Sequence, residues 1–93
     1  MNSMRYSMSG IETYPDSHET FCGIKLDDQY RYFLLIHSIE KGYLFTLIDS
    51  KGDIIDHFLR VSKDKLEDMV FKFCEEYDRF WYPELFENNV LQT

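Results

Sequence analysis

The sequence has no run of about 18 apolar residues, which is the length that a membrane-spanning helix requires. Its first ten residues are polar, with one arginine and no hydrophobic stretch of the kind found in secretory signals. We therefore expect a soluble protein of the cytoplasm.

Cysteine is also rare, because Cys22 and Cys74 are the only two. Without a secretory signal, both are expected to be reduced thiols that are buried as small hydrophobic groups.

Positive charge is in short supply, since 10 Lys and Arg residues stand against 17 Asp and Glu residues and the net charge is −7. Binding of nucleic acid depends on cationic side chains that displace counterions from phosphates, so direct binding is disfavoured. The same sign works against adhesion to anionic membranes and favours association with basic protein surfaces. We expect a basic protein as the partner.

Motifs for catalysis and for cofactors are missing as well. The chain has no phosphate loop, dinucleotide fingerprint, nucleophile motif or two-histidine zinc helix. His18 and Cys22 lack the second pair of ligands that a zinc site needs, and His37 and His57 fall on strands that are not expected to be neighbours. One predicted hairpin gathers polar residues without the spacing of a calcium loop, and we interpret them as turn residues: Asp49, Asp53, Asp56 and His57. We expect no metal, no cofactor and no enzymatic activity.

A chain of 93 residues is long enough for one hydrophobic core and too short for two. Residues 1–19 contain four serines, Gly10 and Pro15 without any apolar period, which predicts an irregular N-terminal arm ahead of one α+β domain over 20–93. Runs rich in β-branched and aromatic residues predict four strands, over 21–26, 30–40, 43–49 and 54–60. The gaps between them are short and contain turn residues, so the strands should form an antiparallel meander.

A C-terminal amphipathic helix should pack on one face of this sheet. Ser62 is expected to cap it, with Asp64 in its first turn. Apolar residues recur at three-and-four spacing along one face: Leu66, Met69, Val70, Phe73, Tyr77, Phe80 and Trp81. The other face carries two acid-before-base pairs: Asp68 with Lys72, and Glu75 with Arg79. Pro83 should end the helix, and residues 83–87 should restart a short helical turn.

The strands over 30–40 and 43–49 carry apolar residues on both faces. A sheet with one face in water shows polar residues on that face, and these two strands do not. One helix can cover only one face of four strands. The other face is left to the N-terminal arm, to residues 85–86 or to a second copy of the chain. We expect the second copy, and therefore a homodimer.

Negative charge is concentrated toward the C-terminus, where residues 64–93 hold eight carboxylates and three cations. Carboxylates on one helix face form a rigid row that can satisfy the Lys and Arg side chains with which a protein binds DNA phosphates. Acidic turns at Asp27, Asp28 and residues 53–56 would extend the row. The candidate partner-binding carboxylates are Asp64, Glu67, Asp68, Glu75, Glu76, Asp78, Glu84, Glu87, Asp27 and Asp28. The alternative is an ordinary solvated helix face.

The length, the acidity and two acidic helix stretches, Lys-Leu-Glu-Asp at 65–68 and Cys-Glu-Glu-Tyr-Asp at 74–78, carry a resemblance. The chain resembles the Arn-like anti-restriction proteins of T-even bacteriophages. The resemblance implies an acidic DNA mimic that binds and inhibits a host restriction endonuclease of the McrBC type.

A bacterial immunity or antitoxin-type protein, which caps the active site of a toxin, is the alternative. Its aromatic residues Tyr77, Trp81 and Tyr82 would then supply most of the binding energy. A small enzyme is the third alternative, and it would need a polar pocket.

Overall fold

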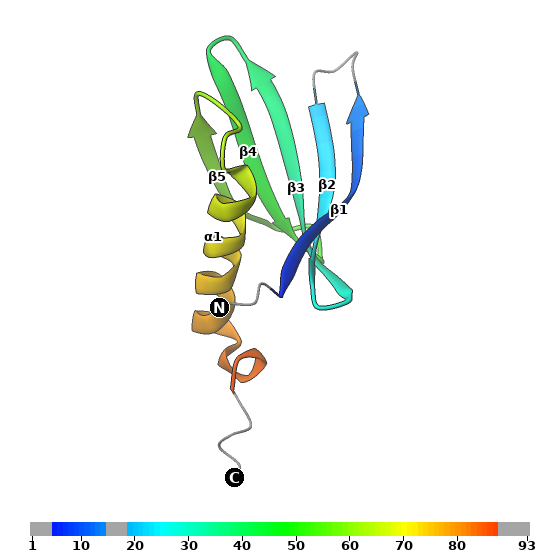
Figure 1. Cartoon of the computed structure of the whole chain (residues 1–93), viewed down its shortest axis with the longest axis vertical. Helices are drawn as coiled ribbons and strands as arrows, with labels where there is room; N and C mark the ends of the chain where they lie inside the picture. The colour runs from blue at the N-terminus through cyan, green and yellow to red at the C-terminus, as the bar shows by residue number, and fades with distance from the viewer. Residues whose placement is uncertain (1–4, 15–18, 88–93) are drawn as a thin grey trace.

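The computed structural model describes residues 5–14 and 19–87, and the side chains of these residues except 11–14. It has an α+β fold in which one helix lies beside an antiparallel sheet of five strands (Figure 1). The strands lie in the sheet in chain order: β1 (Tyr6–Tyr14), β2 (Glu19–Leu26), β3 (Gln29–Ile39), β4 (Gly42–Asp49) and β5 (Ile54–Arg60). They are followed by α1 (Leu66–Trp81) and by the short 3-10 helix η2 (Pro83–Leu85).

The predicted meander is confirmed, and the four predicted strands are β2 to β5. The prediction of an irregular arm over residues 1–19 is wrong, because β1 lies there and pairs with β2 along the edge of the sheet. The register shifts between Ser9 and Glu12, where Gly10 has a φ of 65° that glycine adopts without strain. This bulge interrupts the alternation of side chains along β1, which removes the period that marks a strand in the sequence.

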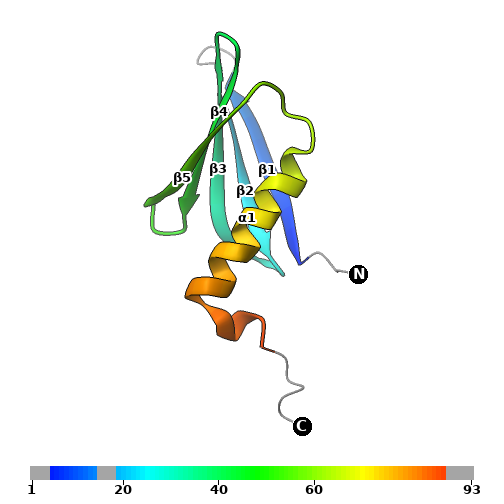
Figure 2. The ribbon, with the colours of Figure 1, turned by 90° about the vertical axis from the view of Figure 1, so that its left-hand side faces the viewer.

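Figure 2 shows α1 lying against one face of the sheet, and the buried core side chains come from this face and from the helix. We call this the inner face. Its side chains alternate along the strands, so that Tyr32, Leu34 and Ile36 of β3 are all buried. The full core consists of Tyr6, Cys22, Ile24, Leu26, Tyr32, Leu34, Ile36, Phe45, Leu47, Val70, Phe71 and Cys74. Both cysteines are free thiols in this core, as expected.

The start of α1 differs from the prediction that Ser62 caps the helix. Lys65 occupies the cap position with a φ of 56° and makes no side-chain cap, and Asp64 lies ahead of the helix. The hydroxyl of Ser62 instead accepts a hydrogen bond from the backbone N–H of Asp64 at 3.2 Å. Ser62 therefore stabilises the turn that leads into the helix.

The apolar face of α1 is rotated relative to the prediction. The buried residues of the helix are Val70, Phe71, Cys74 and Asp78, and the predicted Leu66, Met69, Phe73 and Tyr77 pack beside them and are partly buried. The prediction is wrong for Phe80 and Trp81, which are 72% and 59% exposed. The last turn of α1 extends past the end of the sheet, so these two rings have no strand to cover (Figure 2).

The end of α1 agrees with the sequence. The helix stops ahead of Pro83, and η2 is the short helical turn predicted there. Among the residues that the structure describes, no helix has the length and apolar character needed to cross a membrane.

Candidate functional site

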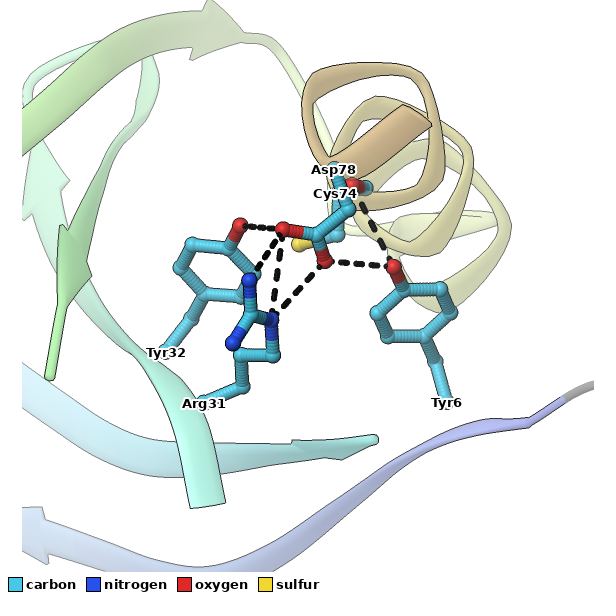
Figure 3. Close-up of polar contacts among 5 residues, drawn as sticks. All are labelled: Tyr6, Arg31, Tyr32, Cys74 and Asp78. Atoms are coloured by element: carbon cyan, nitrogen blue, oxygen red, sulfur yellow. Dashed lines mark hydrogen bonds and ion pairs between the residues drawn. The ribbon is translucent and has the colours of Figure 1, made fainter. Parts of the chain in front are cut away.

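Asp78, one of the carboxylates predicted to contact a partner, is fully buried. It lies between α1 and the sheet, where two tyrosines and one arginine converge on its carboxylate (Figure 3). The hydroxyl of Tyr32 donates to Oδ1 at 2.5 Å, and that of Tyr6 donates to Oδ2 at 2.6 Å. Arg31 donates through Nη2 at 2.8 Å and through Nε at 3.1 Å. The prediction that Asp78 acts as a surface phosphate surrogate is therefore wrong.

A β-bulge places Arg31 in this cluster. Tyr32 pairs with Ile24 and Tyr30 with Lys25, so that Arg31 is an extra residue without a partner on β2. A bulge turns two successive side chains to the same side of a sheet. Arg31 and Tyr32 consequently both reach α1, which strict alternation along β3 would forbid.

The surroundings of Asp78 shift the ionisation of its partners. Burial, followed by the hydrogen bond to Asp78, raises the pKa of both Tyr6 and Tyr32 well above the usual range. The hydrogen bond to Asp78 raises the pKa of Arg31 as well. At neutral pH both phenols are protonated donors and Arg31 is a cation. No buried side-chain nitrogen or oxygen among the described residues lacks a hydrogen-bond partner. The buried polar groups of the cluster are therefore satisfied within the protein. Its role is to hold α1 against β1 and β3.

The exposed face of α1 does not form a row of like charges. The predicted pair of Glu75 with Arg79 is confirmed at 2.8 Å, whereas Asp68 and Lys72 make no ion pair in the described part of the chain. Carboxylates and cations are interspersed among the charged residues of this face: Asp68, Glu75 and Glu76 with Lys65, Lys72 and Arg79. The predicted row of carboxylates on the helix therefore has cations among its members, as the two predicted acid-before-base pairs imply, and its role in binding a partner stays a prediction.

Charge is also balanced around the start of α1 and the neighbouring β3–β4 turn. The carboxylates there are Glu40, Asp64, Glu67 and Asp68, and the cations are Lys41, Arg60, Lys63 and Lys65. Two open clefts, of about 510 and 530 Å³, flank this half of the helix. Leu66 lines both clefts, and Glu67 borders the one that contains Cys22. Burial, with a smaller contribution from Glu67, raises the pKa of Cys22 to about 11.

The opposite end of the sheet carries the excess of negative charge. Alternate turns of a meander lie at the same end, so the β2–β3 turn and the β4–β5 turn share this end. The end of α1 joins them, since Leu85 lies beside Asp27 and Asp28, and Tyr82 lies beside Asp49. We define the acidic end by its six solvent-accessible carboxylates: Asp27, Asp28, Asp49, Asp53, Glu84 and Glu87.

Most cations near the acidic end are already engaged. Arg5 bonds Asp27 at 2.9 Å and lowers the pKa of that carboxyl. Arg31 bonds the buried Asp78, and Arg79 bonds Glu75. In the described residues, the other carboxylates of the acidic end have no ion-pair partner. Lys51, on the β4–β5 turn, is the exposed cation of this end that makes no ion pair in the described structure, and the carboxylates without an ion pair outnumber it.

Asp49 also has a structural role at this end. Its Oδ1 accepts hydrogen bonds from the backbone N–H groups of Lys51 and Asp53, both at 2.9 Å. The interpretation of these residues as turn residues is confirmed for Asp49. Within the described ranges, no group of three or more His, Cys, Asp or Glu residues is arranged to hold a metal ion.

An aromatic cluster adjoins the acidic end. We define it as the partly buried Tyr77 with the exposed Phe80, Trp81 and Tyr82. Phe80 and Trp81 contact edge to face with centroids 4.9 Å apart, and Arg31 lies 4.9 Å above the ring of Tyr82. Exposed Trp and Tyr side chains with little conformational freedom are typical of the residues that dominate protein interfaces.

Comparisons of the chain with protein-family models, with curated proteins and with solved structures find no match.

Proposed function

We propose that this protein is a non-catalytic inhibitor that binds a basic DNA-binding protein and occupies the surface that otherwise holds DNA. The partner class is a host restriction endonuclease of the McrBC type, as the resemblance to the phage anti-restriction proteins implies. The observation that carries the proposal is the acidic end, where three separate chain segments bring six carboxylates together and where, among the described residues, only Asp27 makes an ion pair.

The acidic end replaces the helix face as the imitation of phosphates. A DNA-binding protein presents Lys and Arg side chains that gain free energy by contacting phosphates, and exposed carboxylates can take the place of those phosphates. Asp28 and Asp53 stand on turns held by the sheet, so they are fixed in position before a partner binds. Such preorganisation reduces the entropy lost on binding.

The second candidate is an immunity-type protein that caps a toxin, and the aromatic cluster favours it. Trp81 and Tyr82 would then enter a pocket of the toxin and supply most of the binding free energy. The two candidates use the same end of the molecule. They differ in how far binding depends on charge, because association through carboxylates weakens as salt shortens the screening length to about 8 Å at physiological ionic strength.

Two matched charge variants test the proposal. The first removes four carboxylates from the acidic end: Asp28→Asn, Asp53→Asn, Glu84→Gln and Glu87→Gln. The control removes four exposed carboxylates from the balanced end: Glu40→Gln, Asp64→Asn, Glu67→Gln and Asp68→Asn. Both sets change the net charge equally, and none of these eight carboxylates forms an ion pair in the described structure.

Binding to a purified endonuclease of the McrBC type is measured at low and at physiological salt. We expect the acidic-end variant to bind at least about tenfold more weakly, mainly through slower association, and the control to stay near wild type. Equal loss in both variants would show that net charge alone matters and would contradict the acidic end as the site. An affinity that salt does not change, and that falls when Trp81 is replaced by Ala, would favour the immunity-type candidate.

A further inference from the structure

The aromatic cluster lies on the last turn of α1, which extends past the sheet (Figure 2). Phe80 is 72% exposed, Trp81 is 59% exposed and Tyr82 is 40% exposed. Trp81 is the one tryptophan of the chain. Exposed rings forgo the free energy that burial would supply, and a partner that covers them gains it. The aromatic cluster is therefore suited to contact a partner together with the acidic end.

Trp81 is held in place by other rings of its own helix. Phe80 meets it edge to face with centroids 4.9 Å apart, and Tyr77, about one helical turn earlier, lies 6.4 Å away. Tyr77 stacks in turn on Phe73 at 6.2 Å, and both pack against the buried core. A side chain that is fixed before binding loses little conformational entropy when a partner covers it. Trp81 is thus a preorganised ring.

Carboxylates of the acidic end lie close to these rings. Asp49, on the β4–β5 turn, lines a recess of about 50 Å³ together with Tyr77 and Tyr82. Burial raises the pKa of Tyr77, with smaller contributions from Tyr82 and Asp49. Glu84 follows Trp81 by three residues and is exposed on η2. Neither carboxylate makes an ion pair in the described structure. One surface therefore combines exposed rings with negative charge.

This combination distinguishes between the surfaces with which proteins bind DNA. A protein that reads an intact duplex presents cations to the phosphates and hydrogen-bonding groups to the base edges, while the faces of the bases stay stacked inside the duplex. Imitation of an intact duplex therefore needs carboxylates but no exposed ring. Enzymes that act on a base turn it out of the duplex into a slot lined by aromatic and apolar side chains. A ring beside carboxylates matches an extruded base beside its phosphates.

The orientation of the rings indicates one extruded base and not a run of unpaired bases. Proteins that hold a single strand stack its successive bases on aromatic side chains. Phe80 and Trp81, the two most exposed rings of the cluster, stand at 82° to each other. Two rings at this angle cannot take the place of neighbouring bases that stack in parallel. The indole of Trp81 has two fused rings, like a purine, and is the better match to a base.

We propose that Trp81 enters the slot in which the partner holds a base turned out of the duplex, while carboxylates of the acidic end take the places of the neighbouring phosphates. The proposal rests on the proposed function and deepens it, because it names the part of the DNA-binding surface that the chain fills. The aromatic cluster then has a role that does not require a toxin as the partner.

Substitutions of Trp81 test the proposal by their effect on binding to a purified endonuclease of the McrBC type, at low and at physiological salt. Trp81→Ala removes the ring and should weaken binding at least about tenfold. Trp81→Phe keeps an aromatic face, which a base slot tolerates, and should stay within about threefold of wild type. Trp81→Leu keeps an apolar side chain without that face and should bind at least about fivefold more weakly than Trp81→Phe.

Val61→Ala is the control for loss of an exposed apolar side chain. Val61 is 84% exposed and follows β5 at the end of the sheet away from the β4–β5 turn, so this variant should bind like wild type. Far-UV circular dichroism establishes that each variant is folded. A second measurement uses the unaltered sequence with fluorotryptophan in place of its one tryptophan. The single fluorine NMR signal should shift when unlabelled endonuclease is added, and should return when duplex DNA with the recognition site displaces the chain.

The outcomes separate this inference from the proposed function. Salt-dependent binding that Trp81→Ala leaves within about threefold of wild type would overturn the inference alone. Equal binding by Trp81→Leu and Trp81→Phe would overturn it too, because a general apolar pocket would explain that result. A fluorine signal that does not shift in the complex would have the same consequence. Loss on Trp81→Ala without any dependence on salt, or no binding to the endonuclease, would overturn both.

Discussion

Replacing Asp78 by asparagine tests the view that this residue is structural and does not contact a partner. The substitution keeps the size of the side chain but removes its charge and one of its two acceptor oxygens. In the wild type, the two oxygens accept from Tyr6, Tyr32 and Arg31 at distances of 2.5 to 3.2 Å. In the variant, a new N–H group faces donors, and Arg31 loses its counter-charge inside the protein.

Breaking a buried charge pair by changing one partner typically costs about 3 to 5 kcal/mol, because it leaves the other partner uncompensated. The side chain of Arg31 is 28% exposed, so water can solvate part of its charge. We therefore expect a loss near the lower limit, about 3 kcal/mol. The free energy of unfolding is measured by urea titration, followed by far-UV circular dichroism.

Glu75→Gln is the matched control for this prediction. Glu75 lies on the same helix and also pairs with an arginine, but its side chain is 41% exposed. An exposed pair contributes at most about 1 kcal/mol after screening by solvent, so the control should be nearly neutral. A loss below about 1 kcal/mol for Asp78→Asn, equal to that of the control, would refute a stabilising role for the buried contacts of Asp78.

Three further predictions concern the core and its ionisable groups. Phe71→Ala should lower the free energy of unfolding by about 3 to 5 kcal/mol, because it removes buried apolar area and leaves a cavity. Phe80→Ala, at the exposed end of the helix, should lower it by less than about 0.5 kcal/mol, and urea titration of both variants measures the two losses. The raised pKa values of Tyr6 and Tyr32 stabilise the fold fully below the unfolded pKa of about 10, and this stability is lost as the pH rises above that value. Unfolding free energies between pH 8 and 12 should therefore fall in the alkaline range, and should fall less steeply when both tyrosines are Phe. The buried Cys22, with a pKa of about 11, should react with a thiol reagent at pH 8 only after urea is added, and rapid reaction of the native protein would contradict its burial.

The residue types within single segments of the sequence were enough to predict strands β2 to β5 and the turns between them. The strands β2 to β5 follow from β-branched and aromatic runs, and the turns between them follow from short polar gaps. The strand β1 could not be recognised, because the bulge at Gly10 breaks its alternation and its outward side chains Ser7 and Ser9 are typical of a loop. Tertiary pairing with β2 overrides this weak local preference.

The sequence contains a helical spacing that places Asp78 on the buried side of α1. Val70, Cys74 and Asp78 follow each other at intervals of four, so they share one side of the helix, and Val70 and Cys74 are apolar. A carboxylate in such a stripe indicates a buried group with partners. Asp78 therefore belongs to the buried side of the helix and not to its exposed charge. Its partners could not be predicted, because Arg31 reaches it only through a bulge in β3.

The acidic end could not be predicted from spacing, since it combines two turns and a helix end that are far apart in the sequence. Residues 27–28 and 49–53 come together only because alternate turns of the meander share one end of the sheet. The sequence analysis placed most of the candidate partner-binding carboxylates on α1, where cations lie among them. The excess of negative charge is a property of the sequence, but its distribution over the surface depends on the topology.

The most direct test of the proposed function is competition with DNA. The chain is bound to an immobilised endonuclease of the McrBC type at low salt, and duplex DNA that contains the recognition site of the enzyme is added in increasing amounts. If the acidic end occupies the DNA-binding surface, saturating DNA should release the chain, and excess chain should in turn prevent cleavage of the DNA. A complex that persists at saturating DNA, or an enzyme that binds the chain and still cleaves at the full rate, would contradict the account.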